Sequence, residues 1–133
     1  MIARALRLRR SADFAAVRRQ GRTVSGQLVV LAYRPNGLEH NRYGVAVGRR
    51  IGKAVRRNRI KRWLRESVRR LHPQLRQGYD LVFIARGSLA DPAVTYHDVA
   101  RCMEGLVQRV GLLIESNEAS TNAASSPTEV ITA

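Results

Sequence analysis

The stretch from Arg49 to Arg70 reads RRIGKAVRRNRIKRWLRESVRR; eleven of its twenty-two residues are Arg or Lys, and Glu66 is its only acid. Its apolar residues recur at i, i+3, i+4, i+8 and i+11, the spacing of one helix face: Ile60, Trp63, Leu64, Val68 and Leu71. This spacing predicts a helix from about Lys53 to Leu71, which Pro73 ends. Guanidinium groups cover its other faces and match phosphate oxygens two at a time, so we expect the helix to bind nucleic acid there.

The whole chain is small and strongly basic. It has 133 residues, with 24 basic against 10 acidic side chains and a formal net charge of +14, which predicts one domain with a polyanionic partner. No apolar stretch approaches the roughly 20 residues of a membrane span, and the N-terminus lacks the apolar region of a secretory signal. Cys102 is the only cysteine. These features predict a cytoplasmic protein with no membrane partner and no small-molecule substrate.

Hydrophobic patterning predicts further helices and strands on both sides of the basic helix. Helices are expected at 11–20 and 95–114. Strands are expected near Val24 and at 28–33, 43–47 and 79–85. Ser11 is the expected N-cap of the first helix and Gly21 the residue that ends it. The strands at 28–33 and 43–47 are expected to pair antiparallel, which predicts an α+β fold with helices against one mostly antiparallel sheet.

The two ends of the chain differ in composition from its middle. Residues 1–10 contain four arginines and no acid, which predicts a mobile basic arm. Residues 11–114 are expected to form a single RNA-binding domain. Residues 115–133 are small and polar, with few side chains that could be buried, and are expected to be a disordered tail.

No set of residues has the pattern of a protein-borne active site or of a metal site. The histidines share no metal-ligand spacing and are expected in surface or capping positions: His40, His72 and His97. The isolated acids are expected to act as caps and counter-charges: Asp80, Asp91 and Asp98. We therefore expect no catalytic residue and no metal or other cofactor bound by the protein itself.

The candidate RNA-binding residues lie in and just before the basic helix: Arg49, Arg50, Lys53, Arg56, Arg57, Asn58, Arg59, Lys61, Arg62 and Arg65. A merely solvated charged face is the alternative, which the near absence of acids disfavours. Asn58, a poor helix former, either contacts a base edge or a 2′-hydroxyl or is a polar filler. Phe14 either packs on the sheet or leaves its ring open as a stacking platform for a single-stranded base.

Four sequence blocks occur in order along the chain: LRRSADFAAV at 8–17 followed by Gly21, VAVGRR at 45–50, RNRIKR at 57–62 with Arg65, and YDLVFIAR at 79–86. They resemble the motifs of the protein subunit of bacterial ribonuclease P, over roughly residues 5–113. The resemblance implies an α-β-β-β-α-β-α sandwich with a left-handed β-α-β crossover through the basic helix. Without it, a right-handed crossover would be expected.

The resemblance also implies a function and a second site. Members of this family bind a large catalytic RNA, and the holoenzyme removes the 5′ leader of precursor tRNA by hydrolysis. The RNA carries the active site and its Mg²⁺ ions, while the protein contacts the leader in a cleft between the first helix and the sheet. The corresponding residues here are Phe14, Arg18 and Tyr33, with Arg18 where the family often has a second aromatic side chain. The alternative is a ribosomal or ribosome-assembly RNA-binding protein without a nuclease role.

Overall fold

The computed structural model describes residues 6–8 and 10–114 of the chain. The tail expected over 115–133 and part of the arm expected over 1–10 lie outside these ranges. Arg7 forms a parallel bridge with Tyr43, and the Leu8 amide donates to the Tyr43 carbonyl oxygen at 2.7 Å. Leu8 is also buried. The expectation of a free arm is therefore wrong for these two residues, because backbone pairing and burial join them to the folded domain.

The secondary structure follows the order α-β-β-β-α-β-α that the resemblance implies. The elements are α1 (Ser11–Gln20), β1 (Arg22–Ser25), β2 (Val29–Pro35), β3 (Arg42–Ala46), α2 (Ala54–Leu71), β4 (Tyr79–Ala85) and α3 (Tyr96–Arg109). Short 3₁₀ turns occur at Arg49–Ile51, His72–Gln74 and Gly87–Ala90. The α+β class and the basic helix are thus confirmed.

The four strands form one sheet in the order β1-β2-β4-β3. β2 pairs antiparallel with β1 and with β4, whereas β3 pairs parallel with β4. The predicted antiparallel pairing of residues 28–33 with 43–47 is therefore wrong. β4 takes the place between them, because its near-continuous apolar run is buried on both faces and suits a central strand. β3, α2 and β4 form the expected β-α-β crossover, whose left-handed sense is implied by the resemblance alone.

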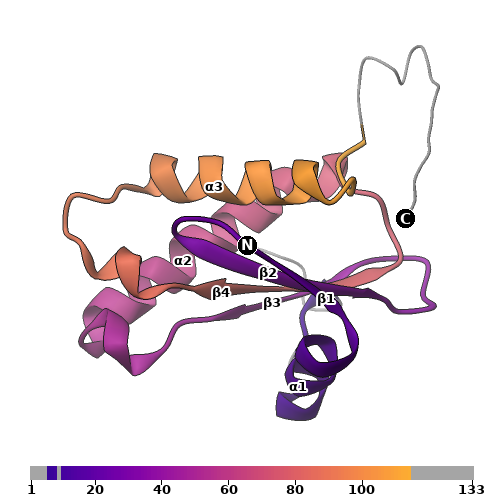
Figure 1. The fold of residues 1–133 in the computed structure, drawn as a ribbon, viewed down its shortest axis with the longest axis horizontal. Coiled ribbons are helices and arrows are strands. Elements are labelled where there is room, and N and C mark those ends of the chain that lie inside the picture. The colour runs from indigo at the N-terminus through magenta and orange to yellow at the C-terminus, as the bar shows by residue number, and fades with distance from the viewer. Residues whose placement is uncertain (1–5, 9, 115–133) are drawn as a thin grey trace.

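Helices cover both faces of the sheet, as Figure 1 shows, with α2 and α3 on one side and α1 on the other. Alternate residues of β4 serve the two sides: Phe83 belongs to the larger core under α2 and α3, and Val82 packs with Val17 of α1. The buried residues of α2 are Ile60, Leu64, Ser67, Val68 and Leu71. The apolar stripe predicted for the basic helix therefore faces the core, although Trp63 is only partly buried.

Two helix ends differ from the expected ones. Arg10, not Ser11, occupies the N-cap position of α1. α3 ends at Arg109 rather than near residue 114, because Gly111 adopts φ +79° and the Leu112 amide donates to the Val107 carbonyl oxygen at 3.0 Å. This is a glycine-based C-terminal motif in which the chain turns away from the helix axis.

Gly21 directly follows α1, as expected, but the reason for a glycine there is steric rather than conformational. Its φ is −91°, which other residues also adopt, whereas a Cβ there would collide with the carbonyl oxygens of Tyr33 and Val17. The glycine therefore lets the end of α1 lie against β2.

Candidate RNA-binding site

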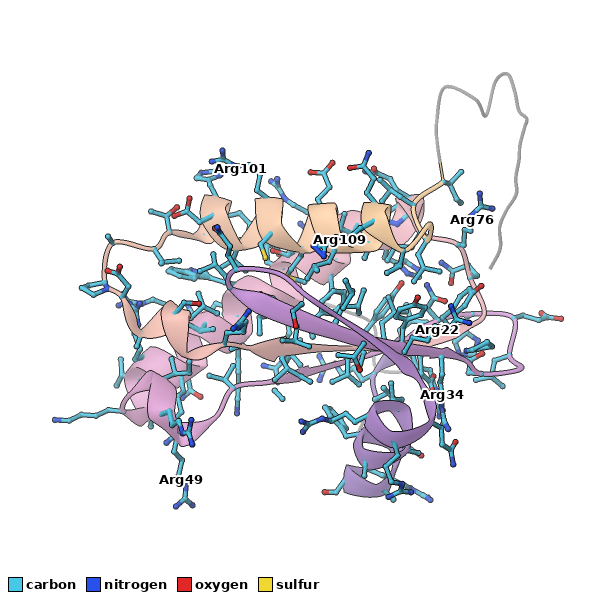
Figure 2. The ribbon with its side chains drawn as sticks, in the orientation of Figure 1. Arg22, Arg34, Arg49, Arg76, Arg101 and Arg109 are labelled. Carbon is cyan, nitrogen blue, oxygen red and sulfur yellow. The ribbon has the colours of Figure 1, made fainter. Side chains whose placement is uncertain are left out.

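Most of the predicted RNA-binding side chains reach solvent around α2 and the 3₁₀ turn before it. Those with no hydrogen bond or ion pair to another described residue are Arg49, Arg50, Lys53, Asn58, Arg59, Lys61, Arg62 and Arg65. In Figure 2 the side chain of Arg49 extends away from the ribbon at the lower left of the view. The basic charges of this group are not neutralised within the described part of the chain, so they are available to a polyanion.

Two of the predicted arginines are held by backbone carbonyl groups. Arg56 Nη2 donates to the carbonyl oxygens of Leu89 and Asp91 at 2.9 and 3.0 Å. Arg57 Nε donates to the Gly52 carbonyl oxygen at 3.1 Å. Both side chains thus attach α2 to neighbouring loops, a role that the density of basic residues in the sequence did not predict.

Glu66 takes its counter-charges from arginines outside the predicted set. It accepts from Arg69 Nη2 at 2.6 Å and lies 3.5 Å from Arg70 Nε. The hydrogen bond from Arg69 lowers the pKa of Glu66 below its ordinary value, and the Arg69 and Arg70 charges act in the same direction. The only acid of α2 therefore offsets one of the two arginine charges at the C-terminal end of the helix and leaves the predicted RNA-binding part fully charged.

A cleft of about 400 Å³ lies between α1 and the sheet. Its walls come from α1, β3 and β4: Ser11, Phe14, Ala15, Arg18, Ala46, Val82 and Ile84. The structure thus brings Phe14 and Arg18 together in one cleft with an apolar floor and an exposed guanidinium group. The floor residues Ala46, Val82 and Ile84 were not predicted as site residues, because strand pairing decides which of them face α1.

The ring of Phe14 packs on the sheet and also lines the cleft, while its stacking on a base stays a prediction. A Cβ on Gly44 would lie 2.5 Å from Phe14 Cζ, which means that the ring rests on the bare backbone of β3. A glycine inside a strand pattern is a known sign of such a close approach. Gly44 is therefore a site residue that the sequence analysis missed although its signal was present.

The basic helix and the cleft meet at Phe14. A small cavity of about 80 Å³ is lined by Phe14 and Gly44 together with Arg65 of α2 and Arg7 of the N-terminal segment. The two predicted sites are therefore adjacent. Arg7 was assigned to the free arm and so was not predicted here; the alternation of Leu6 and Leu8 around it was the available signal.

Tyr33 lies on the opposite side of the sheet from Phe14. It packs against the larger core under α2 and α3, while Ala32, the preceding residue, packs with Val82 on the α1 side. Successive strand residues point to opposite faces, so a shift of one position removes Tyr33 from the cleft. The structure does not bring this predicted cleft residue together with Phe14 and Arg18.

A buried ion-pair network fixes the end of α1 relative to the sheet. Asp80 has no exposed surface and accepts from Arg42 Nε and Nη2 at 2.9 Å and from Asn36 Nδ2 at 3.0 Å. Arg34 contacts Asp80 at 3.4 Å and donates to Gln20 Oε1 of α1 at 2.7 Å. Burial alone would raise the pKa of Asp80, but the hydrogen bonds from Arg42, Asn36 and Arg34 outweigh it and lower that pKa.

Within residues 6–8 and 10–114, no group of three or more His, Cys, Asp or Glu side chains is arranged to hold a metal ion. None of the helices described is both long and apolar enough to cross a lipid bilayer.

The fold thus places the basic helix beside the cleft that Phe14 lines, with Arg65 and Phe14 in contact with the same small cavity. The profile of the family described as Ribonuclease P matches residues 2–111. The chain belongs to the ribonuclease P protein family. The ribonuclease P protein component of Caldanaerobacter subterraneus subsp. tengcongensis is 43% identical over 109 residues, which cover 82% of this chain and 92% of the relative. That of Thermotoga maritima is 37% identical over 107 residues, covering 79% and 90%.

Solved structures of ribonuclease P proteins share the fold. The Thermotoga maritima protein superposes with a TM-score of 0.73 at 35% identity, covering 78% of this chain and 96% of the other. The Staphylococcus aureus protein superposes with a TM-score of 0.75 at 27% identity, covering 83% and 99%. The resemblance seen in four sequence blocks therefore extends to the whole arrangement of helices and strands.

Proposed function

We propose that this chain is the protein cofactor of ribonuclease P, which binds the catalytic RNA and the 5′ leader of precursor tRNA. In this role it promotes endonucleolytic removal of the leader and so produces the mature 5′ end of tRNA. The basic surface of α2 would dock on the catalytic RNA. The cleft between α1 and the sheet would hold the leader, with Phe14 stacking on a base and Arg18 contacting the phosphate backbone.

The adjacency of the two surfaces carries this proposal. Arg65 of α2 and Phe14 of α1 line the same small cavity, so an RNA docked on α2 lies next to the mouth of the cleft. A leader leaving the catalytic RNA could then pass directly onto the sheet. A basic protein between two polyanions also reduces their mutual repulsion, which is a physical reason for the charge of +14.

The hydrolytic step is assigned to the RNA partner. The protein would bring no catalytic side chain, and the Mg²⁺ ions of the reaction would be held by the RNA. The working compartment would be the cytoplasm, where the catalytic RNA and precursor tRNA are made in bacteria. Membership of the ribonuclease P protein family argues against the alternative of a ribosomal or ribosome-assembly protein.

Binding measurements on the reconstituted complex test this assignment. The catalytic RNA of the host is assembled with and without the protein, and its affinity for precursor tRNA and for mature tRNA is measured. The protein should strengthen binding of the precursor with a leader of several nucleotides and leave binding of mature tRNA nearly unchanged. Equal strengthening for both tRNAs would contradict the leader-binding role.

A further inference from the structure

A second, larger pocket lies on the opposite face of the sheet from the leader cleft. It measures about 690 Å³ and sits where α3 ends beside the ends of β2 and β4. Tyr33 and Tyr79 line it, together with Pro35, Val110 and Leu112. In this structure the cleft lined by Phe14 and Arg18 includes none of these residues, and neither does the basic surface of α2.

The two tyrosines form a pair on one face of the sheet. Tyr33 is opposite Leu81 in the register of β2 and β4, and Pro35 is opposite Tyr79, so the two tyrosines are diagonal cross-strand neighbours. Both are half-buried, and neither hydroxyl takes part in a hydrogen bond with another described residue. Two phenol rings thus line an open pocket, and their hydroxyl groups have no hydrogen-bond partner in the described part of the chain.

The rim of the pocket is basic. Four of its lining residues are arginines, none is Asp or Glu, and the arginines are Arg22, Arg34, Arg76 and Arg109. Among the residues that the structure describes, only Arg34 of these four has an acidic partner, Asp80, which it shares with Arg42. Arg76 and Arg109 donate to backbone carbonyl oxygens, which leaves their charge uncompensated. Figure 2 shows Arg22, Arg34 and Arg76 toward the right of the view, far from Arg49 at the lower left.

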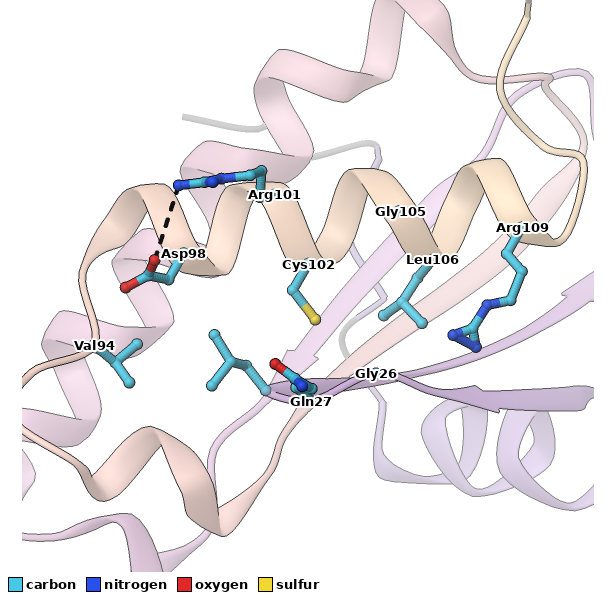
Figure 3. Close-up of a pocket in the computed structure, with 10 residues that line it drawn as sticks. Gly26, Gln27, Val94, Asp98, Arg101, Cys102, Gly105, Leu106 and Arg109 are labelled. Carbon is cyan, nitrogen blue, oxygen red and sulfur yellow. Dashed lines mark ion pairs between the residues drawn. The ribbon is translucent and has the colours of Figure 1, made fainter.

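A neighbouring pocket shows what sets this one apart. The pocket of about 680 Å³ between α3 and the β1–β2 turn also has arginines, but Asp98 lies within it and pairs with Arg101 at 4.0 Å (Figure 3). No aromatic side chain lines it. It therefore lacks both a stacking surface and a rim of uniform charge.

We infer that the Tyr33–Tyr79 pocket is a second binding site for single-stranded RNA, in which an unstacked base contacts the tyrosines and its flanking phosphates contact Arg22 and Arg76. Stacking surfaces combined with a positive rim are the usual means of binding single strands without base specificity. The site rests on the proposed RNA-binding function. It would let the protein hold two RNA segments, one on each face of the sheet.

Nuclear magnetic resonance on the full chain tests the inference, with an oligouridylate of about eight nucleotides as the probe. The amides of Val110 and Gly111 report on the pocket, and those of Ala15 and Ile84 report on the leader cleft. Saturable shifts at Val110 and Gly111 are expected. Shifts in the cleft without shifts in the pocket would overturn the inference and leave the proposed function standing, whereas shifts at neither place would overturn both.

A pair of double variants separates a specific site from general charge. Arg22→Gln with Arg76→Gln should weaken binding at the pocket about tenfold. The slope of log K against log salt should fall by about 0.7 for each lost phosphate contact. The matched control is Arg86→Gln with Arg101→Gln, which removes the same charge elsewhere and should change pocket binding less than twofold. Equal weakening by both pairs would overturn the inference.

The contribution of the base is tested by one further comparison. Tyr79→Leu keeps an apolar side chain at this position but removes the ring, so it should weaken oligouridylate binding at the pocket and leave the cleft shifts unchanged. Inorganic phosphate should shift Gly111 only at much higher concentration than the oligonucleotide. If phosphate bound as well as the oligonucleotide, or if Tyr79→Leu had no effect in a folded protein, the pocket would not be a base-binding site.

Discussion

Phe14 packs against the smaller core and also forms part of the cleft wall. Its ring rests on Gly44 and also lines the cleft beside Arg18. The sequence indicated both possible roles but could not decide between them. The position of the ring depends on Gly44 of β3, which is distant in sequence. Because Gly44 has no side chain, the ring of Phe14 can lie against the strand.

Phe14→Ala should separate leader binding from the other interactions with RNA. Loss of a stacking ring removes about 1–3 kcal/mol of binding free energy per base, so the affinity of the reconstituted holoenzyme for leader-bearing precursor tRNA should fall roughly 5- to 140-fold. Affinity for mature tRNA should hold. A melting curve is the control for folding, and an equal loss for both tRNAs in a folded variant would rule out the cleft assignment.

Arg18→Ala should also weaken leader binding, and the loss of affinity should be smaller at high salt because salt screens the contact of the guanidinium group with phosphate. The loss caused by Phe14→Ala should be almost independent of salt.

Asp80 gives a prediction about pH. Its folded-state pKa is lowered from 3.8, so its contribution to stability is present above that value and lost as pH falls through the folded-state pKa. At neutral pH, Asp80→Asn leaves Arg42 and Arg34 without a buried counter-charge and should cost about 3 kcal/mol. The free energy of unfolding of wild type and variant is measured in urea at neutral pH and at a pH below the ordinary pKa of aspartate. The difference between the two proteins should be smaller at the acidic pH. A gap that stayed constant or widened would mean that the network does not stabilise the fold.

At the scale of elements, helices were predictable from the sequence and strand pairing was not. The 3.6-residue period over α2 is a local signal, and it correctly identified the buried face containing Ile60, Leu64 and Val68. Trp63 lies at the edge of that face and is only partly buried, which a spacing rule does not resolve. The pairing of β3 with β4 depends on a crossover through α2, so no local turn signal could indicate it. The displacement of Tyr33 from the cleft has the same cause, because the register decides the face.

The two ends of α2 should differ in their effect on RNA binding. Arg59 and Arg62 are exposed and unpaired among the described residues, whereas Arg69 and Arg70 share Glu66. Replacing Arg59 and Arg62 together with Gln should weaken binding to the catalytic RNA and reduce the salt slope by about 0.9 per lost contact, taking duplex DNA as the guide.

The matched control replaces Arg69 and Arg70 with Gln, which removes the same charge from the same helix. It should have a much smaller effect on affinity and slope, measured by filter binding over a range of salt. If both pairs reduced affinity equally, the binding would follow net charge rather than a defined surface of α2.

At the scale of the whole molecule, the sheet separates two environments. α1 covers one face only partly and leaves the cleft open, while α2 and α3 cover the other face and bury the larger core (Figure 1). Because α2 is the connection between β3 and β4, its Arg65 comes to line one small cavity with Phe14 of α1. Charge density alone predicted a helix that binds nucleic acid, whereas the adjacency of the two surfaces could be seen only in the fold.

The most direct test of the account is cleavage by the reconstituted enzyme. Precursor tRNA is incubated with the purified protein, with the host's catalytic RNA, and with both, and release of the 5′ leader is measured over time at limiting Mg²⁺. We predict no cleavage by the protein alone and faster cleavage by the complex than by the RNA alone. Leader removal by nuclease-treated, RNA-free protein, or a complex no faster than the RNA by itself, would contradict the assignment of this chain as an RNA-dependent cofactor.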